Sequence, residues 1–179
     1  MNLFIGCTSR ENVSEDYIND SSKLLEELSK IDNVDLVFGS YHKGLMKVAY
    51  DAFKDNNKKI TGVLTEYHKN LAEFEYNYDE TIVVDTTTNR FYEIFNRSDV
   101  ILILPGGLGT LAELFSAIEE RRIENYKKII IYNSNYFYTP IIEALYKMYQ
   151  DGFTHEVPSN YMVIESDYKK IVEIIKEMN

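Results

Sequence analysis

The sequence predicts an α/β fold with a mostly parallel sheet and helices on both faces. Short apolar runs alternate with amphipathic stretches along the whole chain, an order typical of strand–helix units. The runs are continuously apolar, which suits strands that are buried on both faces of a sheet. No linker rich in Gly, Ser or Pro and no internal repeat interrupts the 179 residues. We therefore expect one domain, residues 1–179.

Seven of the short runs are expected to be strands: Asn2–Gly6, Asp35–Phe38, Lys59–Leu64, Thr81–Asp85, Val100–Leu104, Lys128–Tyr132 and Tyr161–Ile164. The stretches between them carry apolar residues at helical spacing. Helices are expected at Glu15–Lys30, Leu45–Lys54, Thr88–Arg97, Thr110–Arg122, Thr139–Tyr149 and Asp167–Met178. Glu66–Glu80 has no clear period, so we interpret it as a loop or short helix over the sheet edge, either surface packing or a flap over a substrate.

The composition excludes several classes of protein. The excess of 29 acidic over 19 basic residues gives a formal net charge of −10, which repels a nucleic-acid polymer. No apolar run approaches the roughly 20 residues of a membrane helix, and the first residues lack a signal-peptide pattern. The one cysteine, Cys7, leaves no partner for an intramolecular disulfide. We expect a cytoplasmic protein that does not contact a membrane.

The most informative segment is Val100–Glu113, a buried strand followed by a glycine-rich turn and an amphipathic helix. Glycines can adopt positive φ and leave no Cβ in the way of a ligand. Thr110 lies near the expected helix start, where free N–H groups and the helix dipole favour a phosphate or carboxylate. Glu113 follows one turn later, roughly 4.5 Å along the axis. The expected phosphate site consists of Gly106, Gly107, Gly109 and Thr110.

A carboxylate and a phosphate repel each other, so a carboxylate at this position indicates a functional role. Activating water or stabilising a cationic transition state would be such a role for Glu113. The glycine spacing matches neither the Walker A motif, since no lysine follows, nor the dinucleotide motif Gly-x-Gly-x-x-Gly. The alternative is purely structural: a tight turn with a capping Thr110 and an exposed Glu113.

Two earlier strands also end in turns of small or glycine residues. Gly6-Cys-Thr-Ser9 follows the first strand, and Gly39-Ser-Tyr-His-Lys-Gly44 follows the second. Because the carboxyl ends of parallel strands meet at one edge, we expect these turns and the glycine-rich loop to converge on one crevice. The expected pocket residues are Gly6, Thr8, Gly39, His42, Gly44 and Met46. His42 is either a ligand contact or an ordinary loop histidine, and Cys7 is expected to be a buried small apolar residue.

Arg90 follows the fourth expected strand at the same edge. Its guanidinium could donate two hydrogen bonds to a phosphate or carboxylate, or the residue could be a solvated helix arginine. Arg97 lies at the end of that helix, where a cation stabilises the dipole. Three scattered histidines and one cysteine offer no metal-ligand spacing, so neither a metal nor another cofactor is expected.

Residues 105–113 read Pro-Gly-Gly-Leu-Gly-Thr-Leu-Ala-Glu and resemble the Pro-Gly-Gly-x-Gly-Thr-x-x-Glu signature of the Lonely Guy (LOG) family. These proteins are cytokinin riboside 5′-monophosphate phosphoribohydrolases, often misnamed lysine decarboxylases. The turns at Gly44-Leu-Met46, Ser98-Asp99 and Asp151-Gly-Phe153 resemble further family positions. The resemblance implies a Rossmann-like, doubly wound fold and a homodimer with helices at its interface.

The second LOG signature is Met-x-x-Arg-Lys, whose arginine forms the catalytic pair with the motif glutamate. Residues 87–91 align with it, and the resemblance therefore implies that Arg90 and Glu113 are catalytic. Thr87 replaces the Met and Phe91 replaces the Lys, which makes phosphate and ring contacts different. Tyr41 and His42 stand where the family usually has glycines, so the pocket is expected to be narrower or differently shaped.

The resemblance implies hydrolysis of the N-glycosidic bond of a nucleoside 5′-monophosphate, of the AMP or cytokinin riboside type, into free base and ribose 5-phosphate. In that reaction Glu113 would stabilise the ribosyl cation and activate water. Two alternatives are a related pyrimidine or deoxynucleotide N-glycosidase or deoxyribosyltransferase, and a non-catalytic nucleotide-binding or carrier protein. Lysine decarboxylation is not expected, because no lysine has a recognisable pyridoxal phosphate context.

Overall fold

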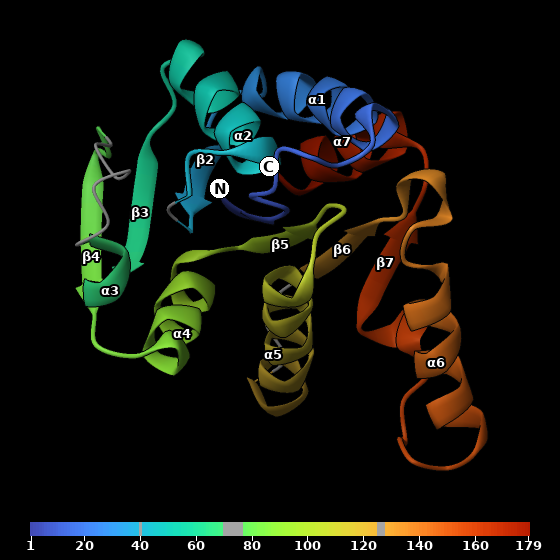
Figure 1. Ribbon diagram of the computed structural model, residues 1–179. Helices are drawn as coiled ribbons and strands as arrows, with labels where there is room; N and C mark the ends of the chain where they lie inside the picture. Colours follow the sequence, from blue (N-terminus) through green and yellow to red (C-terminus); the bar gives the residue numbers. More distant parts are fainter. Residues whose placement is uncertain (40, 70–76, 125–127) are drawn as a thin grey trace.

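The computed structural model describes residues 1–39, 41–69, 77–124 and 128–179 (Figure 1). Within these residues, seven parallel strands form one sheet in the order β4-β3-β2-β1-β5-β6-β7. The expectation of a mostly parallel sheet is confirmed, and every described strand pair is parallel.

All seven predicted strands are present, each starting within one residue of its predicted position. They are β1 (Asn2–Gly6), β2 (Asp35–Phe38), β3 (Ile60–Thr65), β4 (Glu80–Val84), β5 (Val100–Ile103), β6 (Lys128–Tyr132) and β7 (Met162–Glu165). The central strands β1, β2, β3, β5 and β6 are buried along almost their whole length. This burial explains their continuously apolar sequences.

The helices follow the predicted stretches closely. They are α1 (Glu15–Ser29), α2 (Gly44–Asp55), α3 (Glu66–Lys69), α4 (Thr87–Arg97), α5 (Leu108–Glu124), α6 (Thr139–Gln150) and α7 (Tyr168–Met178), with 3₁₀ turns η1 (Ser134–Tyr136) and η2 (Pro158–Asn160). Across the described ranges, no helix is both long and apolar enough to cross a bilayer.

Two of these helices refine the expectations. Helix α5 begins at Leu108, two residues before the predicted start, because the N–H of Leu111 already bonds to the Gly107 carbonyl at 3.0 Å. Thr110 is therefore the third residue of the helix rather than its first. The tract Glu66–Glu80 begins with the short helix α3 and ends in β4, and its residues 70–76 lie outside the described part.

Helices α1, α2 and α7 cover one face of the sheet, and α4, α5 and α6 cover the other (Figure 1). Alternate residues of β1 separate the two cores. Leu3 and Ile5 pack with Leu24 of α1 in the core beneath α1, α2 and α7. Phe4 packs with Leu114 of α5 in the second core. This alternation is the period of two that a strand imposes on its side chains.

The strand order reverses between β1 and β5. From β1 the chain proceeds outward through β2, β3 and β4, and after β5 it proceeds the other way through β6 and β7. The N–H of Leu104 bonds to the Gly6 carbonyl at 2.8 Å, and that of Thr8 bonds to the Pro105 carbonyl at 3.2 Å. These bonds hold the loops after β1 and β5 side by side. Ligands of such sheets bind in the crevice at this reversal.

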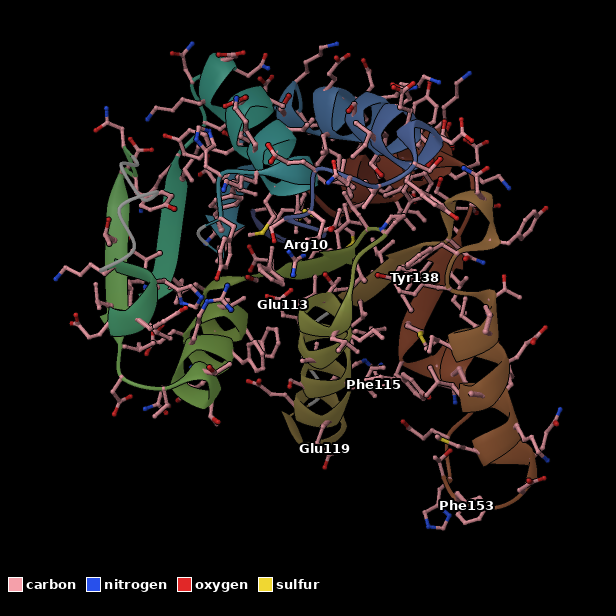
Figure 2. The ribbon with its side chains drawn as sticks, in the orientation of Figure 1. Arg10, Glu113, Phe115, Glu119, Tyr138 and Phe153 are labelled. Carbon is pink, nitrogen blue, oxygen red and sulfur yellow. The ribbon has the colours of Figure 1, made fainter. Side chains whose placement is uncertain are left out.

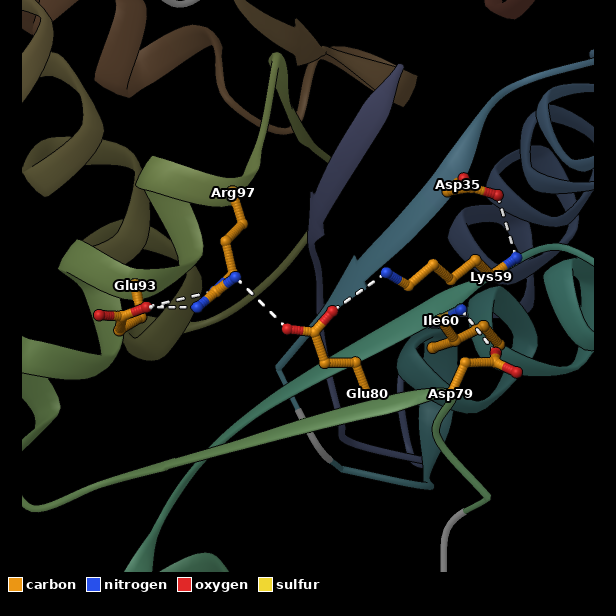
Figure 3. A network of polar contacts seen from close by, with 7 residues as sticks. All are labelled: Asp35, Lys59, Ile60, Asp79, Glu80, Glu93 and Arg97. Carbon is orange, nitrogen blue, oxygen red and sulfur yellow. Dashed lines mark hydrogen bonds and ion pairs between the residues drawn. The ribbon is translucent and has the colours of Figure 1, made fainter.

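A polar network stabilises the opposite, amino-terminal edge (Figure 3). Glu80, at the start of β4, bonds to Lys59 at 3.0 Å and to Arg97 at 3.4 Å. Arg97 also pairs with Glu93 at 3.2 Å within α4. Arg97 lies in the last turn of α4, as expected. Its ion pair with Glu80 also connects that helix to the edge strand β4.

Candidate functional site

A cavity of about 570 Å³ lies at the carboxyl edge of the sheet. The loop after β1 contributes residues 7–10, and the first two turns of α4 and α5 contribute Arg90 and Glu113 among others. Tyr41, Met46 and His68 complete the wall toward β2 and β3. The volume falls in the range of ordinary small-molecule sites, roughly 300–1,000 Å³. The segments that follow the five strands β1 to β5 thus converge here.

The centre of the site is a buried ion pair between α4 and α5. Arg90 Nη1 lies 3.5 Å from Glu113 Oε1, and the two side chains are only 8% and 12% exposed. The rest of the guanidinium is held by main-chain carbonyls: Nε donates to Val63 at 3.1 Å and Nη2 to Gly39 at 2.6 Å. These bonds fix the arginine in one orientation, with its charge directed at the carboxylate.

Two opposing effects act on the Glu113 carboxyl. Burial raises its pKa, and the neighbouring Arg90 guanidinium counteracts part of that rise. Burial and the Glu113 charge also raise the pKa of the Cys7 thiol, which keeps it protonated. Cys7 is buried, as expected. A protonated thiol is a poor nucleophile, so the raised pKa argues against Cys7 as a nucleophile.

Gly106, Gly107 and Gly109 of the glycine-rich loop differ in why glycine occupies each position. A Cβ at Gly106 would collide with the Thr110 side chain, so packing requires glycine there. A Cβ at Gly107 or Gly109 would meet nothing within 4 Å. None of the three has positive φ, so the turn does not use the conformational freedom that glycine allows. Open space beside the first N–H groups of α5 is what glycine provides at 107 and 109.

Two of the predicted pocket residues, Thr8 and Met46, line the cavity. Gly6 and Gly39 lie behind the side chains of Glu113 and Arg90. A Cβ at Gly6 would come within 3.0 Å of Glu113 Oε2, and the Gly39 carbonyl holds the arginine. Glycine at both positions therefore leaves room for the buried ion pair.

The other two predicted pocket residues lie outside the cavity lining. Gly44 has φ of 55°, and a Cβ there would lie 2.5 Å from the Arg10 carbonyl oxygen, so it allows α2 to approach the loop after β1. His42 Nε2 lies 3.3 Å from Asp51 Oδ1, and its ring packs edge-on against Tyr50. These contacts account for His42 as a loop histidine that packs on α2.

The structure adds lining residues that the sequence did not single out, notably Arg10 and His68. The His68 ring packs edge-on against Tyr41 with centroids 5.3 Å apart, and its Nδ1 lies 2.6 Å from Thr65 Oγ1. Burial and the Arg90 charge lower the pKa of His68, which favours the neutral ring. Arg10 follows the end of β1, so the reasoning that placed Thr8 at the carboxyl edge of the sheet could also have placed Arg10 there. His68 lies in the tract Glu66–Glu80, which has no clear period.

Across the described part of the chain, no three His, Cys, Asp or Glu side chains converge as metal ligands would. The site therefore consists of a buried carboxylate–guanidinium pair, one turn from an open helix N-terminus, with aromatic side chains on the opposite wall.

A family model described as "Possible lysine decarboxylase" matches residues 46–175, which include both Arg90 and Glu113. The chain belongs to this family, the LOG family. A "Probable cytokinin riboside 5′-monophosphate phosphoribohydrolase" of Oryza sativa subsp. japonica is 28% identical over 149 residues, covering 81% of this chain and 60% of that protein. The chain thus spans about three fifths of the length of that relative.

Two Arabidopsis thaliana proteins named cytokinin riboside 5′-monophosphate phosphoribohydrolase are similar as well. LOG2 is 27% identical over 149 residues, covering 81% of this chain and 68% of LOG2. LOG3 is 26% identical over 179 residues, covering 98% of this chain and 81% of LOG3. The expected LOG resemblance is confirmed by these relatives and by the family model.

Solved structures share the fold at lower identity. The molybdenum cofactor carrier protein from Chlamydomonas reinhardtii has a TM-score of 0.72 and 16% identity, covering 99% of this chain and 96% of that one. The molybdenum cofactor binding protein from Rippkaea orientalis has a TM-score of 0.66 and 19% identity, with the same coverage. The predicted Rossmann-like α/β fold is confirmed.

Proposed function

We propose that this LOG-family chain hydrolyses the N-glycosidic bond of a nucleoside 5′-monophosphate, of the AMP or cytokinin riboside type, into free base and ribose 5-phosphate. The observation that carries the proposal is the buried pair of Glu113 and Arg90, 3.5 Å apart, one turn into a helix whose start is open. The names of the LOG relatives support the same reaction.

The cavity suggests one orientation for such a substrate. The 5′-phosphate lies at the start of α5, where Gly107 and Gly109 leave space beside free N–H groups. The ribose then lies over Glu113, one turn further along. The base extends toward the aromatic wall of Tyr41, His68 and Phe91, because flat rings pack favourably on aromatic side chains.

In the proposed reaction the C1′–N bond breaks and its electron pair leaves with the base. Positive charge develops on the ribose ring, and the Glu113 carboxylate stabilises it electrostatically. A water oxygen bonds to C1′ and gives one proton to Glu113. That proton passes to the departed base, so the enzyme returns to its starting state. Arg90 favours the ionised carboxylate that both tasks require.

Lysine decarboxylation, the activity in the family model's description, gains no support from this cavity. Its usual chemistry forms a Schiff base between pyridoxal phosphate and a lysine. Among the described residues that line the cavity, none is a lysine.

The homodimer and the cytoplasmic location that the sequence suggested stay proposals. Apolar side chains exposed on and beyond α5 support a self-contact: Phe115 is 43% exposed and Phe153, after α6, is 79% exposed. Size-exclusion chromatography with light scattering tests the dimer, and a monomeric mass across the working concentration range would contradict it.

The experiment that tests the function is chromatography of the products from a panel of ribo- and deoxyribonucleoside 5′-monophosphates, including N6-isopentenyl adenylate. We expect free base and ribose 5-phosphate from at least one ribonucleotide, and none from the Glu113→Gln variant. Lysine serves as the negative control. Nucleotide binding without base release across the panel would contradict the proposal, and release from deoxynucleotides alone, with a trapped covalent sugar, would indicate a deoxyribosyltransferase.

A further inference from the structure

Arg10 occupies a junction between two cavities. The catalytic cavity and a second cavity of about 360 Å³ share Thr8, Arg10 and Gly107 as lining residues. The second cavity continues between the glycine-rich loop and the aromatic pair of Tyr17 and Phe137, whose rings are 5.3 Å apart. Figure 2 shows Arg10 and Glu113 at the same carboxyl edge of the sheet. Arg10 thus lies next to the glycine-rich loop, beside the position assigned to the phosphate.

The main chain of Arg10 is fixed from several sides. Its N–H donates to Thr8 Oγ1 at 3.0 Å, and its carbonyl oxygen packs against Gly44 at the start of α2. The N–H of Thr8 in turn bonds to the Pro105 carbonyl of the glycine-rich loop. The loop after β1 therefore holds the arginine at a defined position relative to α5.

Arg10, by contrast, is an exposed residue, and its side chain forms no ion pair with a carboxylate of the described residues. Arg90 differs, because its nitrogens are already bonded to Glu113, Gly39 and Val63. These two arginines are the basic side chains, other than His68, in the described lining of the catalytic cavity. Arg10 is therefore the cation that can bind an incoming anion without breaking an existing bond.

We propose that Arg10 binds the 5′-phosphate of the substrate, together with the free N–H groups at the start of α5. A guanidinium can donate two parallel hydrogen bonds to two phosphate oxygens. Its charge also offsets the repulsion between a phosphate and the Glu113 carboxylate in a chain of net charge −10. This inference rests on the proposed function, because it assumes a nucleotide whose phosphate lies beside the glycine-rich loop.

Titration calorimetry with ribose 5-phosphate tests the inference without requiring turnover. We expect Arg10→Gln to weaken binding about ten- to hundredfold, the loss typical of a charge-assisted hydrogen bond. The affinity of Arg10→Lys should lie between those of the wild type and Arg10→Gln, because lysine keeps the charge but cannot donate two parallel hydrogen bonds. Arg121→Gln is the matched control: it removes the same charge from a half-buried residue that bonds to the Asn160 carbonyl and does not line the catalytic cavity, and it should bind like the wild type.

Adenosine, which lacks the phosphate, separates phosphate binding from a structural effect. We expect Arg10→Gln to leave its affinity unchanged, with an unaltered circular dichroism spectrum. Equal ribose 5-phosphate affinity in Arg10→Gln and wild type overturns the inference, as does equal weakening for adenosine or absence of binding by the wild type. If ribose 5-phosphate binds through Arg10 but the same wild-type preparation releases no base, this inference is supported and the hydrolysis proposed above is contradicted.

Discussion

The Gly39 carbonyl accepts a 2.6 Å hydrogen bond from Arg90 Nη2 across 51 residues of sequence. The same glycine leaves the space that the guanidinium occupies, since a Cβ built on Gly39 would collide with that nitrogen. Position 39 therefore positions Arg90 in two ways, as a hydrogen-bond acceptor and by lacking a side chain.

Gly39→Ala is expected to displace Arg90 and lower kcat for base release about a hundredfold, the effect of misplacing a catalytic group by about 1 Å. The residue has ordinary φ, so the alanine backbone is unstrained. Steady-state kinetics with the best nucleotide of the panel measures this effect. A variant with wild-type kcat would show that the arginine tolerates displacement.

Gly107→Ala is expected to keep the melting temperature of the wild type, because its Cβ would meet nothing within 4 Å. The methyl group should instead occupy ligand space and weaken ribose 5-phosphate binding several-fold or more. Thermal unfolding and calorimetry on one preparation test both parts. Unchanged affinity would mean that the phosphate does not lie beside this residue.

Much of the fold could be predicted from the sequence. The strands could be placed because buried apolar runs are short and bounded by polar or glycine residues, as at Asp35–Phe38. The start of α5 was predicted two residues late, because the Gly107 carbonyl already accepts the first helical bond. Local sequence does not show which carbonyl a helix uses first.

The site was harder to predict, because its contacts join distant segments. The resemblance suggested Arg90 and Glu113 as a pair, but spacing within either helix cannot show that they lie 3.5 Å apart. His42 was a candidate because it lies in a turn after β2. Its ring contacts Asp51, nine residues later, and does not line the cavity. His68 lies in a tract without periodicity, so no pattern indicated its direction.

The raised pKa of Glu113 predicts an acid limb in the pH profile of kcat. The carboxylate must be ionised to act, and burial raises its pKa, so the rate should fall with decreasing pH at values above those of an exposed glutamate. Arg90→Gln removes the charge that lowers this pKa, and the limb should move to higher pH.

Arg97→Gln is the control for that profile. It removes the same charge from the same helix, but its guanidinium pairs with Glu80 and Glu93 at the other edge of the sheet (Figure 3). Its acid limb should coincide with that of the wild type. An Arg90→Gln limb at or below the wild-type pH would contradict the role given to the ion pair.

Phe91→Ala is expected to separate the base end of the cavity from the phosphate end. Phe91 lines the cavity and stacks on Phe95, with centroids 6.2 Å apart and planes 23° apart. Losing an aromatic contact of about 0.5–1.5 kcal/mol should weaken nucleotide binding several-fold. Ribose 5-phosphate should bind as before, and a parallel loss for both ligands would place the base elsewhere.

In the proposed reaction the buried Glu113 carboxylate drives cleavage of the glycosidic bond, and other groups bind the nucleotide. Single-turnover base release and nucleotide affinity, measured side by side on wild type and Glu113→Gln, test it most directly. We expect release to fall about a hundred- to ten-thousandfold while affinity stays within a few-fold of the wild type. Base release by Glu113→Gln at the wild-type rate would contradict the proposed role of this carboxylate.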